Sequence, residues 1–270
     1  MSLPTVLGFL FGIALFIGSI ILSTNNYMIF VQGAGFVMVI GGTLAAAFVA
    51  FEPRYVLQAL RITLSIFFQH KTTSGILTSE VGRMIRWGYL VQRSGLPALE
   101  TDARRLREKD RFLAFGIDLV ISGYTGQEVR EILANTVDST FHRNTIPADI
   151  LRSMASNAPA FGMIATLVGL AIMLDTLGTD PSQIGPGMAI GLMGTLYGVS
   201  FARIILMPTA SKVQQREEII RFRNFLVAEG LALLAERRSP RYIQDRMNSF
   251  LEPNQHFDID VMLRRGGTNG

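Results

Sequence analysis

Long apolar runs dominate the hydrophobic pattern of this chain. Four runs contain almost no charged residues: 3–22, 30–51, 159–177 and 187–208. The first two carry none, and the last two carry only Asp175 and Arg203, each towards an end of its run. Each run has about the 20 residues that an α-helix needs to cross a bilayer. The sequence therefore predicts an all-α integral membrane protein with four transmembrane helices.

Charged sequence with helical periodicity separates and follows the two pairs of runs. We expect four parts: a first transmembrane hairpin at 1–51, a cytoplasmic helical domain at 52–152, a second hairpin at 153–209, and cytoplasmic C-terminal helices with a tail at 210–270. A retained first span is preferred over a secretory signal peptide, because nothing basic precedes it and no small-residue cleavage pattern follows it.

Helix start and stop signals divide the cytoplasmic parts further. Thr78 is expected to begin a helix that ends at Gly95, and another helix is expected at 98–122. Thr125 and Glu128 match a capping box that opens a helix towards Phe141. After Pro208, helices are expected to residue 237 and over 240–251; the extreme C-terminus is expected to be disordered.

The placement of basic residues predicts the topology. The net charge is +4, yet the short connections 23–28 and 178–186 contain no Lys or Arg. Basic residues close to span ends mark the cytoplasmic side, so both termini and the long loop are expected in the cytoplasm. The basicity is thus explained by topology, and no nucleic-acid partner is expected.

Enzyme chemistry finds little support in the sequence. The chain has no cysteine, and its histidines, His70, His142 and His256, lie far apart with no metal-ligand spacing. No nucleophile-elbow, zinc-protease or phosphate-loop motif is present. We therefore expect a protein that is not an enzyme and that holds no cofactor or metal.

Small and hydroxyl residues recur at helical spacing in the second pair of runs. The stripes are Gly162, Thr166 and Gly169 on one helix, and Gly191, Thr195 and Gly198 on the other. Such a stripe either lets helices pack backbone to backbone or leaves a polar groove for an ion or a partner helix, and the pattern alone leaves both readings open.

Proline and the threonines offer oxygen atoms to a possible ion path. Pro159 has no N–H, so it leaves a carbonyl free near the start of its helix. Thr166 lies two turns on along the same face, and Thr195 can meet it from the neighbouring helix. Asp175 and Arg203 are expected to reach the membrane interface. If ions cross, the essential carboxylate should come from another chain.

Three segments resemble the MotA/PomA family, the A subunits of the bacterial flagellar stator within the MotA/TolQ/ExbB superfamily. Residues 157–170 (NAPAFGMIATLVGL) are similar to its third span, residues 180–198 to its fourth, and Leu206-Met207-Pro208 to its exit proline. Span lengths, the long loop and the C-terminal helices extend the resemblance over nearly the whole chain.

The resemblance implies an ion-driven torque unit in the bacterial inner membrane. The expected assembly is a homopentamer around two copies of a B subunit, whose single helix carries the ion-accepting Asp. The cytoplasmic loop would push the rotor protein FliG. By the same resemblance, the ion path would include Pro159, Gly162, Thr166, Thr195 and Gly198, and Pro159 and Pro208 would act in gating.

The resemblance also bears on the ion and on the rotor contact. Sodium-driven members are similar to this chain in carrying Thr at the Thr166 position, so Na⁺ is favoured over H⁺. In the rotor-facing loop Gly95 and Glu100 match the family pattern, but Gln92 stands at the usual Arg position, Thr101 replaces an acidic residue, and Arg93 is the candidate charge. Alternatives are a proton-driven stator, an ExbB/TolQ-like energiser of envelope transducers, and a non-conducting membrane scaffold.

Overall fold

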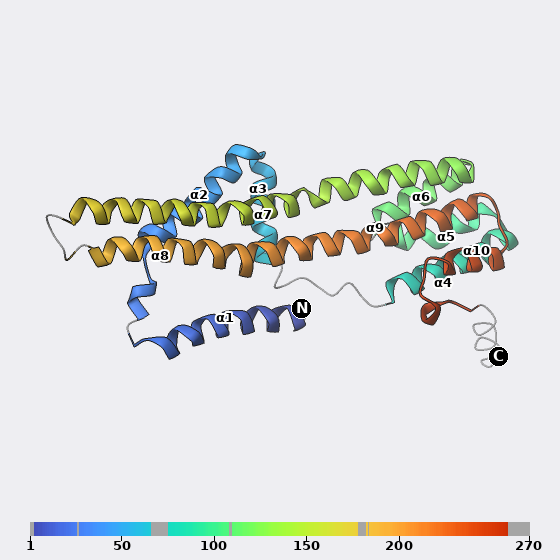
Figure 1. The fold of residues 1–270 in the computed structure, drawn as a ribbon. Coiled ribbons are helices and arrows are strands. Elements are labelled where there is room, and N and C mark those ends of the chain that lie inside the picture. The colour runs from blue at the N-terminus through green and yellow to red at the C-terminus, as the bar shows by residue number, and fades with distance from the viewer. Residues whose placement is uncertain are drawn as a thin grey trace. The chain divides into compact units, whose positions relative to one another are not determined.

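The protein is helical wherever its structure is described. The computed structural model describes residues 3–25, 27–65, 75–107, 110–177, 182 and 184–258, and every regular element in these ranges is a helix (Figure 1). The all-α class expected from the hydrophobic pattern is confirmed.

The principal helices follow one another with short connections. They are α1 (Leu3–Ser23), α2 (Gly33–Ala50), α3 (Pro53–Ser65), α4 (Ile76–Ser94), α5 (Leu96–Arg107), α6 (Arg111–Ile121), α7 (Gly126–Thr176), α8 (Ile184–Ser200), the π-helical segment η3 (Phe201–Leu206), α9 (Met207–Ala235) and α10 (Pro240–Asn248). Two short 3₁₀ turns, Tyr27–Phe30 and Pro253–Gln255, complete the set.

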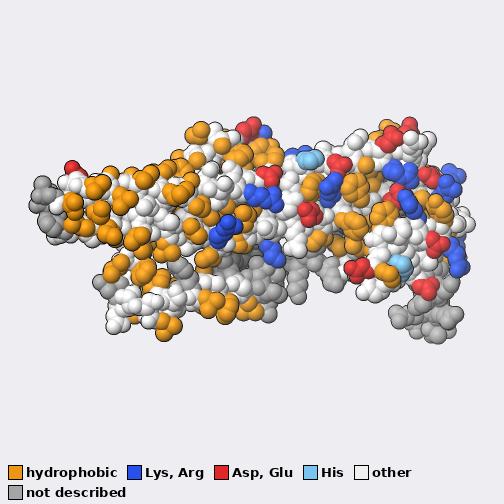
Figure 2. All heavy atoms as spheres, in the orientation of Figure 1, with side chains coloured by type: hydrophobic (Ala, Val, Ile, Leu, Met, Phe, Trp, Pro, Cys, Tyr) orange, Lys and Arg blue, Asp and Glu red, His pale blue; other side chains and the backbone are white. Residues whose placement is uncertain are grey.

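The chain divides into two compact units. Unit 1 comprises Met1–Lys71 and Asn144–Gln215, and unit 2 comprises Thr72–Arg143 and Arg216–Gly270. Hydrophobic side chains cover the visible surface of α8 and of the C-terminal part of α7, whereas charged side chains gather over the helices of unit 2 (Figure 2). The two units therefore present different surfaces, one suited to lipid and one to water.

Three helical stretches of the described chain are long and apolar enough to cross a membrane. They are Tyr27–Ala50, Gly126–Thr176 and Ile184–Ala235. The remaining expected span, residues 3–22, lies on α1 (Leu3–Ser23), which contacts η3. The structure thus gives a helix at each of the four expected places, while the number that cross the bilayer stays a prediction.

The helix expected to begin at Pro159 begins much earlier. α7 starts at Gly126 and runs through both Pro147 and Pro159 to Thr176. An interior proline removes one helical hydrogen bond, but packing of the flanking turns can hold the helix together. Ala155 and Ala158, on the turn before Pro159, are buried in the main hydrophobic cluster of unit 1.

The helix expected to end at Pro208 continues in the same way. The π-helical segment η3 immediately precedes Pro208, and the Met207 N–H donates to the carbonyl oxygen of Ala202, five residues earlier. In a π-helical turn an N–H donates to the carbonyl five residues earlier, so the pattern of donors and acceptors shifts locally. Pro208 has no N–H to donate. The chain therefore passes the proline without a break and continues as α9 to Ala235, close to the expected end at residue 237.

The single helix expected over residues 98–122 is wrong. The structure has α5 and α6 there instead, and Asp110 caps α6 by accepting the Leu113 N–H at 3.0 Å.

The capping box at Thr125 and Glu128 is confirmed: the Thr125 N–H donates to the Glu128 carboxylate at 2.8 Å, and the Glu128 N–H donates to Thr125 Oγ1 at 3.3 Å. Helix α4 begins at Ile76, two residues before the expected start.

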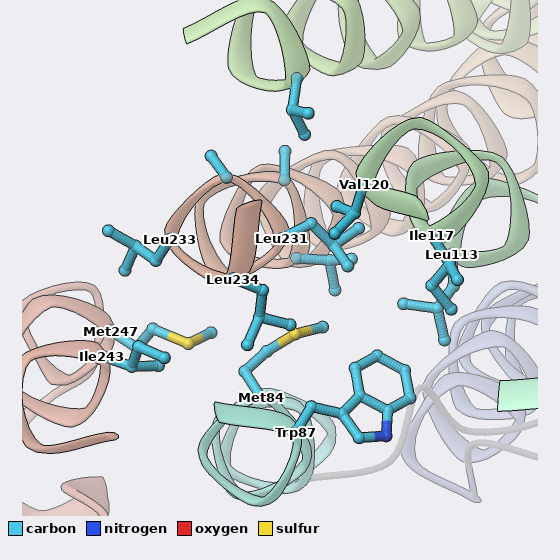
Figure 3. Close-up of a cluster of buried hydrophobic side chains, with 14 of the residues drawn as sticks. Met84, Trp87, Leu113, Ile117, Val120, Leu231, Leu233, Leu234, Ile243 and Met247 are labelled. Carbon is cyan, nitrogen blue, oxygen red and sulfur yellow. The ribbon is translucent and has the colours of Figure 1, made fainter. Parts of the chain in front are cut away.

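Unit 2 is built around a conventional hydrophobic core. Figure 3 shows Trp87 and Met84 of α4 facing side chains of α6, α9 and α10. Trp87 is the only tryptophan of the chain. It is 2% exposed, and its Nε1–H donates to Asp102 Oδ2 at 2.7 Å. Leu231 of α9, fully buried, packs in the same cluster.

Candidate functional site

The two small-residue stripes face each other across the contact between α7 and α8, which lie side by side in Figure 1. A Cβ atom built on Gly169 would lie 2.5 Å from the carbonyl oxygen of Gly187. One built on Gly198 would lie 2.5 Å from the carbonyl oxygen of Ala158. These distances leave no room for a side chain, so the backbones are in direct contact. The packing reading of the stripes therefore holds within this chain.

Thr166 and Thr195 meet in the middle of this contact. Their Oγ1 atoms are 2.6 Å apart, and either hydroxyl can be the donor. Thr166 Oγ1 also lies 3.2 Å from the Gly162 carbonyl oxygen and 3.0 Å from that of Gly191. Thr195 Oγ1 lies 3.3 Å and 3.4 Å from the same two carbonyl oxygens. Two hydroxyls and two carbonyls thus form a cluster of four oxygens, called the threonine cluster below.

The threonine cluster supplies only part of what a cation site needs. Four neutral oxygens are suitable ligands for a hard cation such as Na⁺, but they supply no negative charge and accept no proton near neutral pH. Asp175, the one acidic residue of α7 beyond Pro159, lies more than two helical turns from Thr166. Ion transfer through this site would therefore need a carboxylate from another chain.

A third helix completes the glycine contact. A Cβ atom on Gly35 of α2 would lie 3.2 Å from both the Ile190 carbonyl oxygen and the Gly194 nitrogen. The absence of a side chain at Gly35 thus lets α2 approach α8 closely.

Tyr197 of α8 was missed by the sequence analysis. Its hydroxyl donates to the carbonyl oxygen of Phe30 and accepts the N–H of Gln32 at 2.8 Å, where the chain enters α2. The sequence does carry a signal for this contact: Tyr197 is a lone phenol in an otherwise apolar run, and a phenol hydroxyl away from water needs a hydrogen-bond partner.

Both prolines assigned to gating lie within continuous helix. Pro159 lines an open pocket of about 270 Å³ between α7 and the η3 region, together with Arg152, Ala155, Ser156, Ala202, Arg203 and Met207. Pro208 is exposed, at the second residue of α9. The pocket was also missed, because its lining comes from two helices far apart in the sequence.

Comparisons with known proteins agree on one family. The sequence model of the MotA/TolQ/ExbB proton channel family matches residues 105–223. Chemotaxis protein PomA of Vibrio alginolyticus is 29% identical over 96% of this chain and 100% of its own length. Motility protein A of Treponema phagedenis is 27% identical over 97% of this chain and 99% of its own. The C. jejuni MotAB structure superposes with a TM-score of 0.82 at 19% identity, covering 94% of this chain and 97% of the other.

Over residues 105–223 the chain is similar to the MotA/TolQ/ExbB family. It resembles motility proteins along nearly its whole length, and its fold is that of the MotAB stator structure. It is not an enzyme: the family that it resembles consists of membrane ion channels.

The residues suggested for rotor contact lie near one turn of unit 2. Gln92 and Arg93 are exposed in the last turn of α4, and Glu100 is partly exposed on α5. Gly95 connects the two helices with φ at +76°, a conformation that favours glycine. The structure thus gathers these residues around the α4–α5 turn, while their role stays a prediction.

Two groups of ion pairs link the helices of unit 2, and sequence reasoning did not find them. In the first, Arg223 of α9 binds the Glu80 carboxylate at 2.7 Å and also pairs with Asp110, the cap of α6. Arg83 holds the other oxygen of Glu80 at 2.7 Å. Burial lowers the pKa of Arg223, but hydrogen bonds to Asp110 and Glu80 outweigh it and leave that pKa above its ordinary value.

The second group surrounds Glu229, well past Pro208 and so outside the expected spans. Its carboxylate, 9% exposed, accepts Nε–H of Arg130 and Nε–H of Arg246, each at 2.8 Å. Burial raises the pKa of Glu229, but the two arginines outweigh burial and hold it below the ordinary value. The group ties α7, α9 and α10 together and has the features of a structural site.

Proposed function

We propose that this chain is the A subunit of a bacterial flagellar stator. With a B subunit it would form an ion-conducting unit in the inner membrane that turns the rotor. The proposal draws on its similarity to PomA and motility protein A and on its likeness in fold to MotAB structures.

The observation that carries the proposal is the threonine cluster. Its four oxygens lie on facing helices, held by glycines that bring the backbones into contact. Such a site can replace part of the hydration shell of a cation, provided that a partner brings the charge. A B-subunit helix with an Asp would supply both the carboxylate and the remaining ligands. Pro159, Gly162 and Gly198 would shape this path, and Pro159 with Pro208 would allow the helices to adjust.

The finer features of the proposal come from the family resemblance. They are a pentamer of this chain around two B subunits, both termini in the cytoplasm, and contact with FliG through Gln92, Arg93 and Glu100. Sodium is the proposed ion, because a hydroxyl oxygen at Thr166 suits partly dehydrated Na⁺, whereas a proton needs no such ligand.

Swimming speed against external sodium, at constant membrane potential and pH, tests the proposal. The cells should carry the wild-type chain, Thr166→Ala, Thr166→Ser or Thr176→Ala. Thr176 is the matched control: it lies on the same helix, and its hydroxyl donates to the carbonyl oxygens of Ile172 and Met173, at 3.0 and 3.1 Å. We expect wild-type speed to saturate with sodium, to fall in Thr166→Ala, and to recover largely in Thr166→Ser.

Other outcomes would identify the alternatives. Speed that does not respond to sodium but still falls in Thr166→Ala would indicate a proton-driven stator. Full tolerance of Thr166→Ala and Thr195→Ala would leave the threonines with a packing role only. Normal swimming after deletion of the chain would contradict the stator proposal and favour an ExbB/TolQ-like energiser or a scaffold.

A further inference from the structure

The pocket beside Pro159 carries two basic side chains that the ion path does not use. We call it the arginine pocket; it has a volume of about 270 Å³ and is lined by Arg152, Ala155, Ser156, Pro159, Ala202, Arg203 and Met207. All of its lining lies within unit 1. Two guanidinium groups and one hydroxyl are its polar side chains, and they can all donate hydrogen bonds.

Arg203 is the distinctive member of this pocket. It belongs to the π-helical segment Phe201–Leu206, is exposed, and lies towards the end of the apolar run 187–208. Within the part of the chain that the structure describes, its side chain makes no hydrogen bond or ion pair. A guanidinium beside an apolar run, without a protein counter-ion, calls for an anion or water near it.

Arg152 is only partly neutralised. One of its nitrogens pairs with Asp149 at 2.9 Å, and two contact Gln214 Oε1 at 3.4 Å. The Asp149 carboxylate is 63% exposed, so water screens this pair, and Asp149 does not line the pocket. The pocket therefore keeps a net positive charge, which opposes a bound cation and favours an anion.

We propose that the arginine pocket binds the phosphate of an anionic phospholipid. The arginines would hold the phosphate oxygens, a pairing for which the guanidinium geometry is well matched. Ala155, Ala202 and Met207 offer apolar surface for the glycerol and upper acyl carbons. Basic pockets between transmembrane helices are known places for anionic headgroups.

Pro159 adds a feature that suits a headgroup with hydroxyls. Because proline has no N–H, it cannot donate the helical hydrogen bond to the carbonyl oxygen of Ala155, another lining residue. A hydroxyl of a glycerol headgroup can supply that donor, while a choline headgroup has none. Phosphatidylglycerol is therefore the expected ligand, ahead of phosphatidylcholine.

Native mass spectrometry of the full-length chain, in its purified membrane assembly, tests this site. The assembly in neutral detergent would be mixed with phosphatidylglycerol, phosphatidylcholine or inorganic phosphate, and bound molecules counted per chain. The variants are Arg203→Gln and Arg152→Gln. Lys212→Gln is the matched control, since Lys212 is an exposed cation of the same unit outside the pocket.

We expect phosphatidylglycerol to be retained by the wild type and by Lys212→Gln. Retention should fall about fivefold in Arg203→Gln, the effect of one basic residue at an anionic membrane surface. Arg203→Lys should keep most of it, and circular dichroism should show that each variant keeps its helices.

Four results would overturn the proposal. The first is equal retention of phosphatidylglycerol and phosphatidylcholine, and the second is equal retention by Arg203→Gln and the wild type. The third is loss of a co-purified B subunit from Arg203→Gln with lipid retention unchanged, which would assign the pocket to a carboxylate of the partner. Saturation by inorganic phosphate without any lipid retention would show a free-anion site instead.

Discussion

The contact between α7 and α8 in unit 1 and the core of unit 2 hold helices together in opposite ways. Between α7 and α8, glycines remove side chains until backbone meets backbone, and the polar groups are two threonine hydroxyls. In unit 2, large side chains such as Trp87 and Leu231 fill the space between helices, and ion pairs surround them.

This difference follows from the surroundings of the two units, since the surface of unit 1 suits lipid and that of unit 2 suits water. In water, burying apolar area stabilises a fold, so large side chains contribute most. In lipid, the surroundings are as apolar as the helix interface, and close backbone packing with hydrogen bonds has to provide the stability. Large side chains therefore stabilise the core of unit 2, whereas any added side chain would destabilise the contact between α7 and α8.

The largest effect is expected in the core of unit 2. Leu231→Ala removes a fully buried side chain and should destabilise unit 2 by about 3 kcal/mol. Thermal unfolding followed by the fluorescence of Trp87 reports on this core directly. Leu167→Ala is the control, because Leu167 on α7 is 67% exposed and should change little. If Leu231→Ala and Leu167→Ala lowered the stability equally, the core of unit 2 would not depend on its large buried side chains in the way that we describe.

The next effect is expected from adding size between α7 and α8. Gly198→Ala places a Cβ against a backbone carbonyl that cannot move easily, and should cost about 2 kcal/mol. Gly185→Ala, in the same helix, has no heavy atom within 4 Å of the new carbon. We expect the first variant alone to lose helical signal or solubility at lower temperature, with the Trp87 transition unchanged. If Gly198→Ala shifted the Trp87 transition and left the helical signal and solubility unchanged, its effect would not be confined to unit 1.

Removing the charge of Glu229 should have a smaller effect. Glu229→Gln weakens two hydrogen bonds to arginines and should lower the stability of unit 2 by about 1–2 kcal/mol. Glu131→Gln, on an exposed side chain of α7, is the control. The measurement is again the Trp87 transition, now taken across pH.

The pH dependence of that effect has a defined sign. The folded pKa of Glu229 lies below its ordinary value of 4.5, so its contribution is complete above that value and is lost as the pH falls below it. The difference between the wild type and Glu229→Gln should therefore shrink in acid. A difference that grows as the pH falls would mean that the carboxyl is protonated in the folded protein.

The smallest effect is expected at the exposed ion pair of Arg221 and Asp138. The two groups are 2.8 Å apart, but the side chains are 39% and 45% exposed. Asp138→Asn should change stability by about 0.5 kcal/mol or less, and added salt should reduce that further. A change as large as that of Glu229→Gln would show that exposure does not separate the two kinds of pair.

Local signals in the sequence predicted several features of the site correctly. The stripe spacing placed Thr166 opposite Thr195, and the capping box placed the start of α7. Proline was the misleading signal. Pro159 and Pro208 were expected to begin and end spans, but helix packing and the π turn carry the chain past both. A single sequence cannot weigh one lost hydrogen bond against such packing.

What the sequence determined by itself is the periodicity: apolar runs of membrane length, small residues on one helical face, charges elsewhere. These are properties of neighbours along the chain, fixed by helix geometry. What only the tertiary structure decided is which distant residues meet, as Glu229 meets Arg130 and Arg152 shares a pocket with Arg203. Such contacts depend on how helices pack, and many side chains far apart in sequence contribute to that choice together.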